Sequence, residues 1–267
     1  MEKEKIIAFC YDFDKTLTPD DMQSQGFIQS LGVSSYDFWK ETSETTRKGN
    51  MDSNLSYMYT MLKKYNEKSG PLTKDALQSY GVGLAFFPGV LNWFLLINKF
   101  AKTLGVKVEH YIISSGIKEM IEGCAIAKFF KKIYASSFYY ESNIAVWPAM
   151  VVNYTNKTQF LFRISKGFLD ETDERVNEAI SPEDYRIPFK RILYLGDSAT
   201  DIPCMKVVTN YGGYSLGIYD SVLSNSKRVE RMLQEKRIWK YFQSDYRENS
   251  PLFVACCDII REISLDD

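Results

Sequence analysis

The feature that most limits the possible folds is a set of short, continuous apolar runs that alternate with helical stretches. The run from Ile6 to Cys10 has no polar alternation, which is typical of a strand buried on both faces of a parallel sheet. Similar runs lie at residues 108–113, 133–138, 191–195 and 214–219. Helical periodicity appears between several of them, over residues 90–104, 117–131 and 157–166. This alternation predicts a doubly wound α/β fold with a parallel sheet, in which ligands bind beyond the carboxyl ends of the strands.

The segment from Pro19 to Phe87 differs because it contains no strand-like run. Helical stretches separated by glycines fill it, and the helix expected over residues 53–68 carries one apolar face, formed by Leu55, Met58, Leu62 and Tyr65. We therefore expect a small all-helical domain at residues 19–87. It would be inserted after the first strand of a core formed by residues 1–18 and 88–267.

Composition narrows the class of protein. Lysine plus arginine number 33 and aspartate plus glutamate 34, a net charge of −1, which argues against electrostatic binding of nucleic acid or anionic membrane. The five cysteines lack CxxC spacing and are typical of reduced thiols. No signal peptide is visible, and the longest apolar run, near residues 91–97, is too short to span a bilayer. We expect a cytoplasmic protein.

Two carboxylates follow the first strand, at Asp12 and Asp14, and a second acidic pair follows a later strand, at Asp197 and Asp201. Residues two apart at a strand end lie on the same side, so the first pair can converge on one point. A hard divalent cation such as Mg²⁺ would remove their repulsion. The alternative is an ordinary turn or capping cluster, since aspartate and threonine are common where strands end.

Two further features lie between these acidic pairs. Ser114-Ser115-Gly116 follows the second strand, where hydroxyls and backbone N–H groups entering a helix make an anion site or, more often, a simple cap. Lys157 opens a helix, where its charge opposes the helix dipole and indicates a partner. An exposed surface lysine is the competing interpretation.

Taken in order, DxDxT from Asp12 to Thr16, the serine, the lysine and GDxxxD from Gly196 to Asp201 resemble the motifs of the haloacid dehalogenase-like (HAD) superfamily of phosphohydrolases. The resemblance implies that Asp12 is a nucleophile that forms an aspartyl-phosphate, and that Asp14 is the general acid/base. It also implies that Mg²⁺ is the cofactor, bound at Asp12, the backbone carbonyl of Asp14 and Asp197, with Asp201 helping directly or through water.

The resemblance places Ser114 on the transferring phosphoryl group and Lys157 between nucleophile and phosphate. Two alternatives stay open: Ser115 beside Ser114, and Lys166, which ends the helix that Lys157 begins. We prefer Lys157, since the helix dipole explains a terminal lysine such as Lys166. The expected phosphate-binding set is Thr16, Ser114, Ser115, Gly116 and Lys157.

The presence of Asp14 indicates phosphoryl transfer, because dehalogenating relatives lack a carboxylate there. The helical insert resembles the family's C1 type of cap, which closes over the site, and the layout is closest to phosphoserine-phosphatase-like members. The second cap position holds only a predicted hairpin at residues 139–152. We expect a magnesium-dependent phosphatase for a small phosphorylated metabolite. The alternatives are a phosphotransferase or mutase with the same chemistry, or a non-catalytic phosphate-binding module; oligomeric state stays open.

Other candidates have simpler explanations. His110, the only histidine, begins a strand away from the catalytic end and is expected to be structural. Aromatic and basic residues of the insert either face substrate or fill its core: Trp39, Arg47, Tyr57 and Tyr59.

Overall fold

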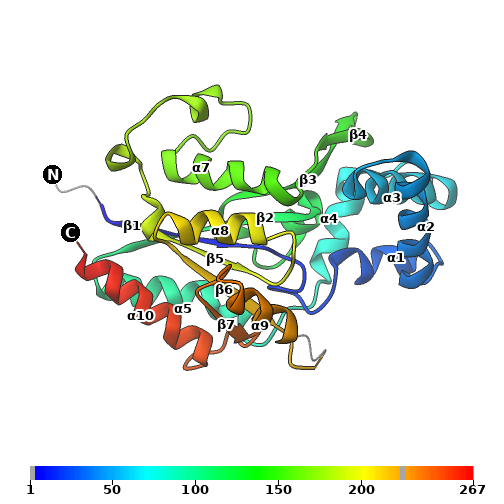
Figure 1. The fold of residues 1–267 in the computed structure, drawn as a ribbon. Coiled ribbons are helices and arrows are strands. Elements are labelled where there is room, and N and C mark those ends of the chain that lie inside the picture. The colour runs from blue at the N-terminus through cyan, green and yellow to red at the C-terminus, as the bar shows by residue number, and fades with distance from the viewer. Residues whose placement is uncertain (1–3, 223–225, 267) are drawn as a thin grey trace.

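A computed structural model describes residues 4–222 and 226–266 and shows an α/β sandwich with a helical insert at one end (Figure 1). In these ranges the sheet has seven strands in the order β4-β3-β2-β1-β5-β6-β7. All neighbours are parallel except β3 and β4. The strands are β1 (Ile6–Tyr11), β2 (Lys107–Ile117), β3 (Phe130–Glu141), β4 (Ile144–Met150), β5 (Ile192–Gly196), β6 (Tyr214–Tyr219) and β7 (Lys240–Gln243).

Helices cover both faces of this sheet. Side chains of α5 (Val90–Thr103) and α10 (Pro251–Leu265) join Phe9 and Tyr11 in one buried cluster. Side chains of α7 (Thr158–Lys166), α8 (Ile202–Asn210) and α9 (Ser226–Gln234) join Ala8 and Cys10 in the other. Successive residues of β1 therefore point into opposite layers, which is why its sequence is apolar without alternation.

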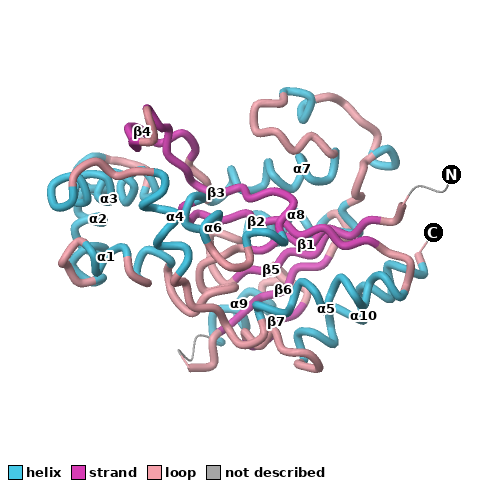
Figure 2. The backbone as a smooth tube through the Cα atoms, turned by 180° about the vertical axis from the view of Figure 1, so that it is seen from behind, coloured by secondary structure: helices cyan, strands magenta, loops and turns pink. Residues whose placement is uncertain are grey.

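The insert consists of helices, as predicted: α1 (Phe27–Ser30), α2 (Ser35–Gly49), α3 (Ser53–Ser69) and α4 (Lys74–Val82). Side-chain oxygens at Ser34, Asp52 and Thr73 cap the starts of α2, α3 and α4. The insert lies beyond the carboxyl ends of the parallel strands (Figure 2). The structure thus confirms an all-helical insert after β1, while the domain bounds 19 and 87 stay a prediction.

The predicted helix over residues 117–131 is largely wrong. Helix α6 covers only Lys118–Gly123, β2 continues through Ile117, and β3 already begins at Phe130. The helix ends where α6 meets α4: a Cβ on Gly123 would lie 2.0 Å from the backbone oxygen of Gln78. Tertiary packing rather than local periodicity sets this boundary.

The predicted hairpin is present, and it contacts the insert. Ser142 and Asn143 form its turn with φ of 47° and 70°, the left-handed conformation that two-residue hairpin turns use. Beyond the turn, the Ala145 amide donates to the Leu72 carbonyl at 2.8 Å, and the Lys74 amide donates to the Asn143 carbonyl at 3.1 Å. The hairpin therefore extends the sheet toward the insert.

Two other observations complete the fold. Strand β7 was not predicted, since its four residues carry no continuous apolar run. Among the described residues, no helix is both long enough and apolar enough to cross a membrane.

Candidate active site

The chain turns sharply after β1, and this turn positions the first acidic pair. The Asp12 amide continues the strand pairing by donating to the Leu195 carbonyl at 2.9 Å. The amides of Thr16, Leu17 and Thr18 then all donate to the Phe13 carbonyl, which closes a compact loop. Lys15, within this loop, has a φ of 59°, a conformation that non-glycine residues seldom adopt outside special sites.

Asp12 lies against a fully buried lysine. The Lys157 Nζ donates to Asp12 Oδ1 at 3.2 Å and to Asp201 Oδ1 at 2.8 Å. Burial, with Asp201 nearby, raises the pKa of Asp12 to about 7, although the lysine opposes the shift. A buried ammonium without partners would be very costly, so the two carboxylates explain why Lys157 tolerates complete burial.

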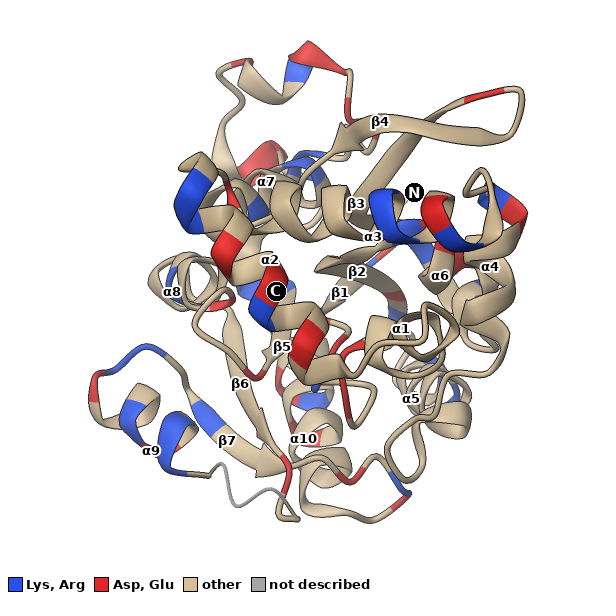
Figure 3. Ribbon diagram, turned by 90° about the vertical axis from the view of Figure 1, so that its right-hand side faces the viewer, with Lys and Arg blue, Asp and Glu red and all other residues tan. Residues whose placement is uncertain are grey.

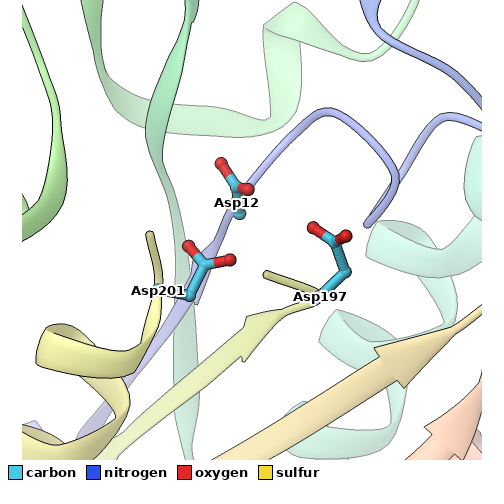
Figure 4. A group of neighbouring side chains, drawn as sticks. All are labelled: Asp12, Asp197 and Asp201. Carbon is cyan, nitrogen blue, oxygen red and sulfur yellow. The ribbon is translucent and has the colours of Figure 1, made fainter. Parts of the chain in front are cut away.

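Three carboxylates converge at this point, from the ends of β1 and β5 and the start of α8. Oxygen atoms of Asp12, Asp197 and Asp201 lie within 4.8 Å of one another (Figure 4). Asp197 is buried, and its Oδ2 has no hydrogen-bond partner among the described residues. Burial and the two other carboxylates raise the pKa of Asp197 well above its usual range. An unsatisfied buried carboxylate oxygen beside two more is the donor set that a hard cation such as Mg²⁺ fits.

Asp201 differs from the other two because its oxygens are already satisfied. Oδ1 accepts from Lys157 and from the Tyr194 hydroxyl at 2.8 Å, and Oδ2 accepts from the amide and hydroxyl of Ser198. Gly196 makes room for it, because a Cβ there would lie 2.6 Å from Asp201 Cγ. Glycine is thus required at the end of β5 by the carboxylate five residues later.

Asp14 points toward the insert. Its Oδ1 accepts from the Met22 amide at 2.8 Å. Burial, with Asp21 and Asp12 nearby, raises the pKa of Asp14 well above its usual range. A Cβ on Gly116 would lie 3.0 Å from Asp14 Oδ2 and 2.2 Å from Met22 Cε, so a glycine leaves the space that this carboxyl occupies.

Some of the other predicted site residues line the pocket that contains Asp12, and others do not. Ser114 and Ser115 line the same pocket as Asp12, and the Ser114 hydroxyl accepts from the Gly116 amide at 3.0 Å. Thr16 is fully buried and is not among the residues that line this pocket. Lys166 lies at the far end of α7, where its Nζ donates to the carbonyls of Val176 and Glu178. Of the two candidate lysines, only Lys157 contacts Asp12.

Two connected pockets lie between core and insert. The catalytic pocket, about 240 Å³, contains Asp12, Asp14 and Asp197, and the adjoining insert pocket, about 470 Å³, shares Asp14 with it. Three of the four candidate insert residues line the insert pocket: Trp39, Arg47 and Tyr57. Tyr59 does not line it, and 52% of its surface is exposed.

Contacts from the insert close this region. The Tyr57 hydroxyl donates to the Ser115 carbonyl at 2.6 Å, and the Asn54 amide group donates to the Val152 carbonyl at 2.7 Å. Several residues that line the catalytic pocket were not predicted: Asp21, Ser53, Asn54, Asn153 and Arg228. They belong to no motif and come from four separate segments, so their spacing along the chain carries no signal.

His110 is distant from these pockets and has partners of its own. Its Nδ1 lies 3.0 Å from the Tyr11 hydroxyl and its Nε2 lies 3.1 Å from Asn98 Oδ1. Burial lowers the pKa of His110 to about 3, so the ring is neutral. These contacts agree with the structural role that was predicted.

Comparison with known proteins identifies the family of this chain. Residues 9–206 match the haloacid dehalogenase-like hydrolase family. An uncharacterized protein of Borreliella burgdorferi is 30% identical over 94% of this chain and 95% of its own length.

Two solved structures share the fold at lower identity. One is a HAD family hydrolase from Salmonella enterica serovar Typhi, with 19% identity, a TM-score of 0.54 and 79% of this chain covered. The match spans only 62% of that hydrolase's own chain. The other is a phosphoserine phosphatase in apo form, with 13% identity, a TM-score of 0.57, and 91% and 96% of the two chains covered. On the family match and the Borreliella relative, this chain belongs to the haloacid dehalogenase-like hydrolases.

Proposed function

We propose that this protein is a magnesium-dependent phosphatase that hydrolyses a small phosphomonoester through an aspartyl-phosphate on Asp12. The observation that carries the proposal is the contact of a buried lysine with Asp12, next to the unsatisfied Asp197 oxygen. The fold shared with a phosphoserine phosphatase supports the same class of reaction.

The residues have complementary parts in this mechanism. The Asp12 carboxylate attacks phosphorus, and the bond from phosphorus to the substrate oxygen breaks. Asp14, whose pKa burial raises well above its usual range, gives its proton to that leaving oxygen. The Asp14 carboxylate then takes a proton from water, which attacks the aspartyl-phosphate, releases inorganic phosphate and restores Asp12.

Asp12, Asp197 and the backbone carbonyl of Asp14 would hold Mg²⁺, and the ion would lower the pKa of Asp12 and offset charge on the phosphoryl oxygens. Asp201 would act indirectly, because its oxygens already accept four hydrogen bonds and orient Lys157. Ser114 and Ser115 border the position that the phosphoryl group would occupy. The insert would exclude water during the first step.

The test is to trap the intermediate. Wild-type protein with Mg²⁺ and p-nitrophenyl phosphate, quenched in acid, should carry phosphate on the peptide that contains Asp12, as seen by mass spectrometry. Asp12→Asn should lose both the phosphopeptide and turnover. Full turnover by Asp12→Asn would contradict the mechanism. Adding acceptor alcohols separates a phosphatase from a phosphotransferase, because only the latter accumulates a new phosphoester.

A further inference from the structure

Arg228 is a basic residue at the catalytic pocket that no motif predicts. It lies in the first turn of α9, which shows its lysines and arginines in blue in Figure 3. Arg228 lines the pocket that contains Asp12, Asp14 and Asp197, and its Nη1 lies 3.7 Å from Asp197 Oδ2. The guanidinium therefore faces the acidic cluster from the segment that follows β6.

The cations around this pocket differ in what they already bind. Lys157 is buried and donates to two carboxylates, and Lys15 donates to Asp21 Oδ2 at 2.7 Å. Arg228 has an ion pair that is longer than a hydrogen bond, and the structure gives its side chain no hydrogen bond among the described residues. Its side chain is 55% exposed. Of the two cations that line this pocket among the described residues, Lys15 and Arg228, only Arg228 therefore has side-chain donors left for a ligand.

The position is not that of an ordinary surface arginine. Arg231, one turn later on the same helix, has a side chain that is 79% exposed, and it pairs with Glu235 at 2.7 Å. Arg228 faces a buried carboxylate whose oxygen accepts no hydrogen bond from the described part of the chain. A planar guanidinium offers paired N–H donors that match two oxygens of a phosphoryl group, which a second ammonium would not.

We propose that Arg228 binds the phosphoryl group of the substrate and positions it for attack by Asp12; this inference rests on the proposed function. The pocket is lined by more carboxylates than cations, so a phosphate dianion needs added positive charge to enter. A divalent cation at Asp197 would neutralise the carboxylate that Arg228 now faces, and the guanidinium donors would then serve the phosphate.

This role predicts that the loss of Arg228 weakens phosphate binding but does not weaken Mg²⁺ binding. Arg228→Gln removes charge-assisted hydrogen bonds to phosphate, which corresponds to about 10-fold weaker binding or more. The same change removes a positive charge beside Asp197, so Mg²⁺ should bind equally well or more tightly. Replacing a residue that merely supported the shape of the pocket would weaken the binding of both ligands.

The experiment compares wild type, Arg228→Gln, Arg228→Lys and the matched control Arg231→Gln. Calorimetry measures the Kd of Mg²⁺ alone and of inorganic phosphate with Mg²⁺ present, and steady-state assays on p-nitrophenyl phosphate give KM and kcat. We expect Arg228→Gln to raise the phosphate Kd and the KM about 10-fold or more without weakening Mg²⁺. Arg228→Lys should recover part of the loss, and the control should behave as wild type.

Two results would overturn the assignment. One is a phosphate Kd within twofold of wild type in Arg228→Gln. The other is weaker binding of both ligands, which would mean that Arg228 only orders Asp197. Failure of the proposed function is distinguishable, because it would appear as absent turnover in the wild type while the phosphate Kd still depended on Arg228.

Discussion

Replacing Asp12 with asparagine should abolish activity and yet stabilise the metal-free protein. Burial beside Asp201 raises the pKa of Asp12 from its usual 3.8 to about 7. When folding raises the pKa of an acid, the free energy of unfolding falls as the pH rises from the pKa of the unfolded state to that of the folded state. For Asp12 this loss of unfolding free energy is about 4 kcal/mol above pH 7. Asparagine cannot ionise but offers Lys157 only a neutral acceptor, so we expect a gain of about 2–4 kcal/mol at pH 8.

The assay is thermal unfolding in EDTA. For a chain of this length, each kcal/mol shifts the Tm by roughly 2 °C, so Asp12→Asn should melt about 4–8 °C above wild type at pH 8. At pH 5 the gain should fall below about 2 kcal/mol, because the wild-type carboxyl is then protonated in the folded state. Asp258→Asn, at an exposed ion pair with Arg261, is the control and should change little. A variant less stable than wild type at pH 8 would refute this account of charge repulsion.

Three other predictions concern the metal, the insert and the core. Mg²⁺ at about 100 times its Kd should stabilise the wild type by about 2.7 kcal/mol. Asp197→Asn should remove that gain in a melting experiment, and an undiminished gain would place the ion elsewhere. Gly81→Ala should lower the free energy of unfolding in urea by about 1–3 kcal/mol, because its Cβ would lie 2.0 Å from the Met120 carbonyl oxygen. Gly83→Ala should not, because its Cβ would have no neighbouring element within 4 Å. The buried His110 is neutral in the folded state and gains a proton on unfolding below pH 6.5. The free energy of unfolding of the wild type should therefore fall by about 2 kcal/mol between pH 6.5 and pH 5 relative to His110→Gln. Parallel pH profiles of unfolding for the two proteins would contradict this.

Much of the core could be predicted because its signals are local. Continuous apolar runs predicted β1, β5 and β6 closely, since a strand covered on both faces needs apolar side chains in every position. Polar residues that directly follow such runs come together in the fold. Parallel strands end at the same edge of the sheet, so Asp12 and Asp197 are adjacent in space. The roles assigned to these residues remain proposals.

Other features depended on contacts that local sequence does not record. The end of α6 at Gly123 follows from its close approach to α4, and the short strand β7 has no apolar signature of its own. Helix ends favour Lys157 over Lys166, but only the fold shows that Lys157 contacts Asp12 and that Lys166 contacts loop carbonyls.

The sequence by itself determined an α/β core, a helical insert after the first strand and two acidic pairs at strand ends, because period and residue type are properties of neighbours along the chain. Tertiary structure alone decided that hydrogen bonds saturate Asp201, that Asp197 keeps an oxygen with no hydrogen-bond donor in residues 4–222 and 226–266, and that Arg228 faces this oxygen. Burial and hydrogen-bond satisfaction depend on groups brought together from distant segments, and these decide which carboxylate is left to bind a cation.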